Sequence, residues 1–210
     1  MKILVTGGTG FVGSHVVAAT VRTGNDVRLL VRRPEQVPAS LSPLGVEVSD
    51  IVVGDVLDQN AVSRAVEGCA AAVHAAAIFS LDSRRAEAMR RTNARATELV
   101  LNSATQRGLD PIVYVSTTVA LTRYGGSSPD LPLGDIARPY AQSKIASEQL
   151  ARRLQDTGAP VVTVYPGRSM APTTPTGGPK PSRCVGYCSA GSRHFPVAVS
   201  MSSTCAMSPP

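Results

Sequence analysis

Apolar runs and amphipathic stretches alternate along the first 165 residues of the chain. Short apolar runs bounded by turn residues predict buried strands over 2–6, 26–31, 46–53, 70–75, 111–115 and 160–165. Between them, apolar positions at helical spacing predict helices over 11–23, 58–66, 83–107 and 139–157, with Asp58 as an N-cap. This alternation predicts an α/β fold of Rossmann type, a doubly wound parallel sheet with helices on both faces.

The pattern changes near Arg168. The 42 residues from Ser169 to Pro210 contain no Asp or Glu and hold seven of the 16 prolines. Apart from a brief apolar run at Phe195–Val199, the segment shows neither the helical nor the strand periodicity of apolar residues. Such a segment cannot bury enough apolar surface to offset the conformational entropy that is lost when a chain becomes ordered. We therefore expect a dinucleotide-binding domain over 1–168 and an irregular, disordered tail over 169–210.

Composition narrows the function classes. With 43% apolar residues, no apolar run approaches the length of about 20 residues that spans a bilayer. The N-terminus does not read as a secretory signal, so we expect a cytoplasmic protein with no membrane contact. The net charge of +6 comes with arginines on the predicted helices and few aromatic residues, which argues against nucleic-acid binding.

Three of the four cysteines lie in the tail, at Cys184, Cys188 and Cys205. Cys184 and Cys188 are four residues apart, but a zinc site would need two more good ligands nearby, and only Cys205 and His194 are available. We expect no bound metal.

The segment TGGTGFVG, Thr6 to Gly13, follows the first predicted strand and opens the first predicted helix. In that context Gly7, Gly10 and Gly13 are typical of a loop that holds the pyrophosphate of a dinucleotide. Gly7 would allow the tight turn, Gly10 the close approach of the pyrophosphate, and Gly13 the packing of the helix on the sheet. Thr9, Phe11 and Val12 complete the predicted phosphate site, since a helix N-terminus offers free N–H groups.

The second predicted strand ends in Arg32 and Arg33, with no acidic residue before Glu35. An acid at this place would bind the ribose 2′-hydroxyl of NAD, whereas a guanidinium suits the 2′-phosphate of NADP. The sequence therefore favours NADP, with NAD as the second choice.

A Tyr140-Ala-Gln-Ser-Lys144 motif places a phenol and an ammonium on one face of the last predicted helix. A nearby ammonium favours the phenolate, so we expect Lys144 to lower the pKa of Tyr140 from its usual value near ~10. Tyr140 would then exchange a proton with a substrate oxygen while the nicotinamide exchanges hydride with the adjacent carbon.

Together with the loop, these motifs resemble the extended short-chain dehydrogenase/reductase family, nearest its dihydroflavonol reductase and 3β-hydroxysteroid dehydrogenase branch. The family also includes nucleotide-sugar epimerases and dehydratases. The resemblance covers Met1 to Gly167 and implies further roles. It assigns contacts with the adenine to Asp55 and Val56, and contacts along the dinucleotide to Ala75, Ala76 and Ala77. It also assigns binding of the nicotinamide ribose to Lys144 and a place beside the nicotinamide to Pro166. It also matches Asn93 to a helix asparagine, although an exposed polar residue is an equal alternative.

The resemblance assigns the third catalytic role, orientation of the substrate oxygen, to a hydroxyl in Val115-Ser116-Thr117-Thr118. Thr117 is the first choice, and Ser116 and Thr118 remain open. Beyond Gly167 the family continues with a substrate-binding domain, which the tail does not resemble. This departure is typical of a truncated or frame-shifted product, with a genuine disordered tail as the alternative.

Three functions therefore remain. The first is an NAD(P)-dependent oxidoreductase acting on a small carbonyl or alcohol substrate, with catalytic residues Thr117, Tyr140 and Lys144. The second is a nucleotide-sugar epimerase or dehydratase. The third is an inactive remnant that binds NAD(P). An open sheet edge after the sixth strand also suggests pairing with another chain, as in a homodimer.

Overall fold

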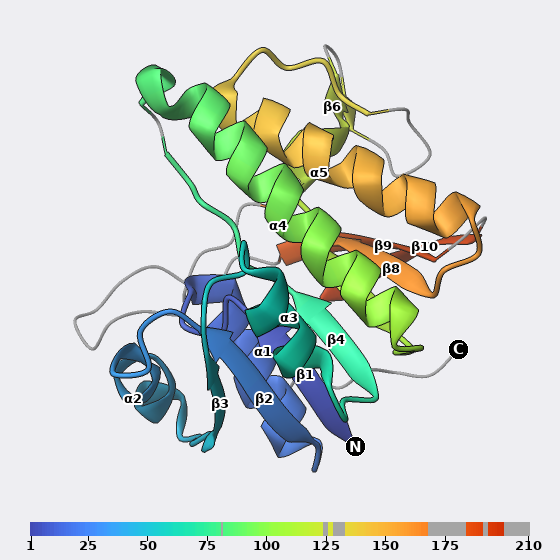
Figure 1. The fold of residues 1–210 in the computed structure, drawn as a ribbon. Coiled ribbons are helices and arrows are strands. Elements are labelled where there is room, and N and C mark those ends of the chain that lie inside the picture. The colour runs from blue at the N-terminus through green and yellow to red at the C-terminus, as the bar shows by residue number, and fades with distance from the viewer. Residues whose placement is uncertain (81, 124–125, 128–132, 168–183, 191–192, 200–210) are drawn as a thin grey trace, which may run out of the picture.

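A mostly parallel sheet forms the centre of the computed structural model, which describes residues 1–80, 82–123, 126–127, 133–167, 184–190 and 193–199. Its strands lie in the order β10-β9-β8-β5-β4-β1-β2-β3 (Figure 1). The parallel strands are β1 Lys2–Thr6, β2 Asp26–Val31, β3 Asp50–Val53, β4 Ala71–His74, β5 Ile112–Val115 and β8 Val161–Tyr165. The order β3-β2-β1-β4-β5-β8 is that of a Rossmann sheet, so the predicted fold class is confirmed.

The helices alternate with these strands. They are α1 Phe11–Arg22, α2 Gln36–Leu41, α3 Gln59–Val66, α4 Ala86–Gln106 and α5 Pro139–Asp156. Short 3-10 turns at Ser42–Leu44, Ser83–Arg85 and Thr118–Leu121 and a small β6–β7 ribbon, Thr122–Arg123 with Gly126–Ser127, fill the connections. Asp58 caps α3 as predicted, because its carboxylate accepts a hydrogen bond from the Asn60 amide at 2.9 Å.

Near the start of the chain, one helix and one strand differ from the sequence prediction. Helix α2 is not predicted, since it has only six residues and Pro38 lies within it. Strand β3 begins at Asp50 rather than Val46, because pairing with β2 starts where Asp50 meets Arg28. Val46 is nevertheless buried, which explains why its segment has the apolar character of a strand.

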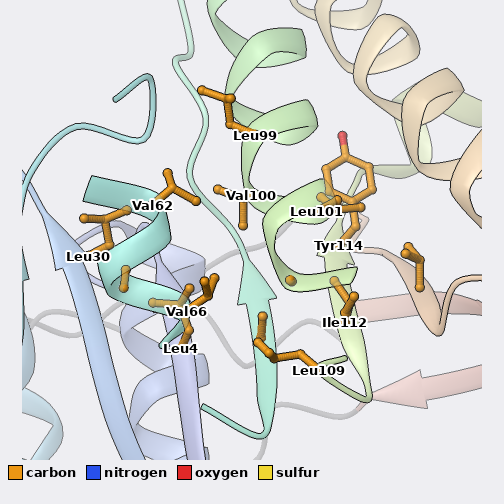
Figure 2. Close-up of a cluster of buried hydrophobic side chains, with 14 of the residues drawn as sticks. Leu4, Leu30, Val62, Val66, Leu99, Val100, Leu101, Leu109, Ile112 and Tyr114 are labelled. Carbon is orange, nitrogen blue, oxygen red and sulfur yellow. The ribbon is translucent and has the colours of Figure 1, made fainter. Parts of the chain in front are cut away.

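The helices cover both faces of the sheet, and the alternation of side chains along the strands divides the core in two. Leu4 of β1 and Leu30 of β2 face the side of α3, α4 and α5, where Figure 2 shows Leu30 beside Val62 and Leu4 beside Val66. The neighbouring Val5, Leu29 and Val31 face the side of α1 and α2. Helices α4 and α5 lie side by side over β5 and β8 (Figure 1).

The tail contains a hairpin that the sequence does not predict. Strand β9, Cys184–Ala190, pairs antiparallel with β8, and β10, Arg193–Val199, pairs with β9. The free backbone groups along β8 explain the difference, because a strand edge accepts a partner through main-chain hydrogen bonds whatever its side-chain pattern. The homodimer inferred from that open edge stays a prediction. The other residues of the predicted tail, 169–183, 191–192 and 200–210, lie outside the described residues.

Within the described part of the chain, no helix has both the length and the apolar character needed to cross a bilayer. For the residues considered as zinc ligands, Cys205 lies outside the described residues, and only the backbone of Cys184, Cys188 and His194 is described.

Candidate active site

The glycine-rich loop between β1 and α1 is shaped by positions where a Cβ does not fit. Gly7 has a φ of +76°, and a Cβ on it would lie 2.6 Å from the Ala76 amide nitrogen. A Cβ on Gly13 would lie 2.0 Å from the Gly7 carbonyl oxygen. Gly13 thus allows α1 to pack on its own loop rather than on the sheet, which corrects the reason given by sequence reasoning.

Helix α1 begins at this loop without a side-chain cap. Gly10 occupies the N-cap position, and its amide donates a hydrogen bond to the Gly7 carbonyl at 2.9 Å. The first-turn amides, those of Phe11, Val12 and Gly13, carry the positive end of the helix dipole. The loop therefore presents a positive helix end at the carboxyl end of β1, where an anion is favoured.

A cavity of about 330 Å³ lies at the carboxyl ends of β1, β2, β3 and β4. The predicted cofactor residues that line it are Gly7, Thr9, Gly10, Arg32, Asp55, Val56, Ala75, Ala76 and Ala77. Residues that sequence reasoning did not place there also line it, namely Leu30, Val31, Gly54, Leu57, Ile78, Thr92, Asn93 and Ala96. The predicted residues outside its lining are Phe11, Val12, Gly13, Arg33, Tyr140, Lys144 and Pro166. Backbone and small side chains after β1 and β4 leave room beside a positive helix end, and the polar Arg32, Asp55 and Asn93 complete a lining that is compatible with a dinucleotide.

The two arginines after β2 lie at a second hollow of about 290 Å³. Thr9, Arg32, Arg33 and Gln36 line it, and Thr9 and Arg32 also line the larger cavity. The unpredicted helix α2 supplies Gln36. No carboxylate lines this hollow, so its electrostatic character favours an anion.

Asp55 lies at the rim of the cavity after β3. One carboxylate oxygen accepts a hydrogen bond from the Leu57 amide at 2.9 Å and so fixes the turn. The helix-capping role that a carboxylate here could have had belongs to Asp58. Asp55 therefore lines the cavity without being needed to cap α3.

On α5, the side chain of Lys144 is buried between the helix and the sheet. It is 4% exposed, and its ammonium donates a hydrogen bond to the Val115 carbonyl at 2.8 Å. The same ammonium lies 4.7 Å from the centre of the Tyr114 ring. Burial lowers the pKa of Lys144 to about 8, and the charge of Glu148 acts in the opposite direction.

Tyr140, one turn before Lys144, is partly buried, and its ring meets that of Phe79 edge to face at 4.9 Å. Burial raises the pKa of Tyr140. The expected lowering by Lys144 is therefore wrong for this structure, because the ammonium is engaged by the end of β5 instead. Tyr140 is thus a protonated phenol at neutral pH, which suits a proton donor.

The hydroxyl candidates lie where β5 ends. Thr117 is 9% exposed, and its hydroxyl donates to the Pro166 carbonyl at 3.5 Å and accepts from the Val119 amide at 3.4 Å. The Thr118 amide also donates to the Pro166 carbonyl, at 3.1 Å. These contacts bring Thr117 and Pro166 together and leave the choice among the three hydroxyls open.

Asn93 connects the cavity with α5. It is 3% exposed, and its amide accepts from the Ile78 amide at 2.8 Å and donates to the Ile78 carbonyl at 3.0 Å. It also donates to the Ser143 hydroxyl at 3.1 Å. The alternative of an exposed helix residue is wrong, and Asn93 instead fixes the loop after β4 against α5.

His74, at the end of β4, has a buried polar environment that the sequence did not predict. The His74 ring is 1% exposed and lies between the hydroxyls of Thr6, at 2.8 Å, and Thr97, at 3.2 Å. Burial lowers the pKa of His74 to about 3. The neutral ring therefore joins β1, β4 and α4 beneath the cavity.

The chain is similar to proteins of one family over most of its length. A family model described as the NAD dependent epimerase/dehydratase family matches residues 3–190. A putative dihydroflavonol 4-reductase of Synechocystis sp. is 35% identical over 182 residues, which is 82% of this chain and 52% of that protein. The chain spans about half the length of the curated relatives that it matches.

Solved structures with a similar fold are short-chain dehydrogenases/reductases and nucleotide-sugar dehydratases. A short-chain dehydrogenase/reductase superfamily protein from Agrobacterium tumefaciens, with bound NAD, is 30% identical, with a TM-score of 0.65 over 79% of this chain and 48% of that one. A dTDP-glucose 4,6-dehydratase from Streptomyces venezuelae, also with NAD bound, is 32% identical, with a TM-score of 0.65 over 77% of this chain and 54% of that one.

Proposed function

This chain belongs to the NAD dependent epimerase/dehydratase family, and from that membership we propose that it reduces a carbonyl compound with a nicotinamide dinucleotide, NADP in preference to NAD. Its resemblance to the extended short-chain dehydrogenases/reductases is likewise confirmed. The observation that carries the proposal is the cavity itself, since it meets a glycine-rich helix start at the switch point of the sheet.

The cavity lining suggests how the cofactor would be held. The α1 N-terminus would bind the pyrophosphate, Asp55 and Val56 the adenine, and the three small side chains of 75–77 would leave room along the dinucleotide. When bound, the reduced nicotinamide supplies a hydride to the substrate carbon. Tyr140 would give its phenolic proton to the substrate oxygen.

The preference for NADP rests on the hollow formed by Thr9, Arg32, Arg33 and Gln36. Two guanidiniums and two neutral polar side chains form a donor-rich site of the kind that a 2′-phosphate requires. The similar solved structures carry NAD, so a direct comparison of the two cofactors is needed.

Calorimetric titration of the full chain with NADPH and NADH tests this preference. We expect NADPH to bind about tenfold to 100-fold more tightly, the value of one to two charge-assisted hydrogen bonds. Replacing both Arg32 and Arg33 by Ala should remove the difference. The matched control replaces the exposed Arg107 and Arg153 by Ala and removes the same charge. Equal affinities, or a ratio unchanged by the double variant, would contradict the proposal.

A path from the cavity to Tyr140 supports the catalytic assignment. Ile78 lines the cavity, and the next residue, Phe79, contacts the Tyr140 ring. Because Asn93 binds both the amide and the carbonyl of Ile78, this loop is held in place beside α5. Thr117 would orient the substrate oxygen, and Lys144 would bind the nicotinamide ribose, as in the family that the chain resembles.

The second candidate is a nucleotide-sugar epimerase or dehydratase, the activity named for one of the solved relatives. The side chains beside Tyr140 argue for the first candidate. Ile78 is 41% exposed and Phe79 is 62% exposed, so an apolar surface flanks the proton donor. Such a surface favours a carbonyl substrate with an apolar body over a sugar.

Two assays of the full chain separate the candidates: NADPH oxidation with aryl ketones, and product analysis of nucleotide sugars incubated with the chain and NAD⁺, because an epimerase or dehydratase regenerates its cofactor and consumes no NADPH. Turnover of a ketone supports the proposal, and conversion of a nucleotide sugar supports the second candidate. Tight binding of NADPH without turnover of either class would support the third function, an inactive remnant.

A further inference from the structure

Four side chains recur every four residues along α5. Tyr140, Lys144, Glu148 and Arg152 therefore lie in one row along the helix. The first two belong to the predicted catalytic motif, and the last two were not noticed in the sequence. Glu148 stands out because it is 0% exposed, although a carboxylate is among the side chains least often buried.

Only one of the two carboxylate oxygens of Glu148 has hydrogen-bond partners among the described residues. One carboxylate oxygen accepts a hydrogen bond from the Tyr165 hydroxyl of β8 at 2.5 Å and lies 3.3 Å from the Arg152 guanidinium. The other oxygen is buried without a hydrogen-bond partner among the described residues. An unpaired buried charge is costly, so the positive charges near Glu148 must offset its burial.

Two cations flank this carboxylate along the helix. Arg152 lies one turn after it and is partly exposed, with 31% of its side chain accessible. Lys144 lies one turn before it and is buried. Glu148 makes its ion pair with Arg152, at 3.3 Å, but that cation is partly exposed and is screened by solvent. Lys144 and Glu148 are one helix turn apart and both buried, so their charges act on each other through space in less polar surroundings.

We propose that Glu148 is a positioning residue for the active site, a buried counter-charge that keeps Lys144 protonated and held against the end of β5. The proposal rests on the proposed function only in naming Lys144 as the lysine that binds the cofactor ribose.

The other groups around Lys144 do not supply a negative charge. From β4, His74 is neutral because its pKa falls to about 3. From β5, burial raises the pKa of Tyr114 well above its usual value, so its ring contacts the ammonium as a neutral phenol. Burial also raises the pKa of Tyr140 on α5 itself. From β8, Tyr165 reaches Glu148 as a hydrogen-bond donor.

Glu148 is thus the described titratable group whose charge opposes the effect of burial on Lys144. Burial alone favours the neutral amine, which would lose one hydrogen-bond donor and the attraction to the Val115 carbonyl and the Tyr114 ring. The charge of Glu148 opposes this effect, and the pKa of Lys144 is lowered to about 8.

The test is a pH titration of Lys144 in the full chain without cofactor. The sequence has only three lysines, Lys2, Lys144 and Lys180, so the ¹³Cε signal of Lys144 can be followed by NMR and assigned with Lys144→Arg. In Glu148→Gln the midpoint should fall by about one pH unit. Glu148→Asp, which keeps the charge, should restore part of the shift.

Glu98→Gln is the matched control, because it removes an exposed α4 carboxylate that pairs with Arg95. It should leave the midpoint unchanged. Arg152→Gln provides a second test if Glu148→Gln does not fold, as judged by circular dichroism. Removing the repulsive cation should raise the midpoint. An unchanged midpoint in Glu148→Gln, or a lowered one in Arg152→Gln, would overturn the proposal.

The affinity for NADPH, measured across the same pH range, separates this inference from the proposed function. We expect affinity to decline at lower pH in Glu148→Gln than in the unmodified chain. If the Lys144 midpoint shifts while the affinity profile does not, the effect of Glu148 on Lys144 stands and the ribose role of Lys144 fails.

Discussion

The cavity at the carboxyl ends of β1 to β4 and the interface beneath α5 are built in different ways. Part of the cavity wall is backbone and small side chains from short local segments, such as Gly7 and Gly10 after β1 and Ala75–Ala77 after β4. The interface is formed by buried polar side chains that meet across long separations, as Asn93 meets Ser143 and Glu148 meets Tyr165. A binding site made of backbone tolerates no added atoms, whereas a site made of side chains depends on each hydrogen bond.

The largest expected effect separates chemistry from binding. Tyr140→Phe removes the phenolic proton but keeps the ring that packs on Phe79. Any carbonyl reduction should fall by about 10²- to 10⁴-fold, the usual contribution of a general acid, with the affinity for NADPH unchanged. The assay is NADPH oxidation beside calorimetric titration. Full activity in this variant would show that another group donates the proton.

The next effect concerns the cavity alone. The Cβ that Gly13→Val adds would lie 2.0 Å from the Gly7 carbonyl oxygen, so the loop must move. We expect the affinity for NADPH to fall at least about 100-fold, equivalent to about 2.7 kcal/mol. Ala19→Val adds bulk to the same helix away from the loop and is the control. Similar affinities in the two variants would contradict the role of the loop.

His74 lies where the two regions meet, and it makes a prediction about pH. Its folded-state pKa of about 3 is below the unfolded value of 6.5, so the unfolded chain binds more protons between these values. The free energy of unfolding should therefore fall as the pH drops below 6.5, by about 2 kcal/mol at pH 5.

Urea unfolding of the full chain between pH 5 and pH 7 measures this dependence. His74→Gln should reduce the slope, and His15→Gln removes a histidine outside the buried network as a control. An equal slope in the chain and in His74→Gln would exclude His74 as its source.

The smallest effect concerns a single bond in the interface. The Ser143 hydroxyl donates to the Tyr140 carbonyl at 2.9 Å and accepts from the Asn93 amide at 3.1 Å. Ser143→Ala should lower the free energy of unfolding by about 1 kcal/mol, because Asn93 loses a buried partner. Ser63→Ala on α3, whose hydroxyl accepts from Gln59 at 3.3 Å, is the control. Equal stability of the two variants would mean that the Asn93 bridge contributes little.

The contrast between local segments and distant contacts explains which features of the structure can be predicted from the sequence. The six parallel strands from Lys2 to Tyr165 and the glycines Gly7 and Gly10 of the cavity follow from local patterns, because an apolar run or a glycine spacing carries the needed information. Helix α2 lacks such a pattern, since it is short and contains Pro38. The burial of Glu148 depends on Tyr165, which is 17 residues away. Local spacing does reveal one clue, the four-residue recurrence from Tyr140 to Arg152.

The central claim is that the cavity at the carboxyl ends of β1 to β4 binds a nicotinamide dinucleotide. Amide hydrogen exchange of the full chain with and without NADPH tests it most directly. We predict slower exchange with NADPH in residues 7–13, 32–36 and 75–78, and no change in the last two turns of α5. Unchanged exchange in these three segments, or protection confined to another part of the chain, would contradict the claim.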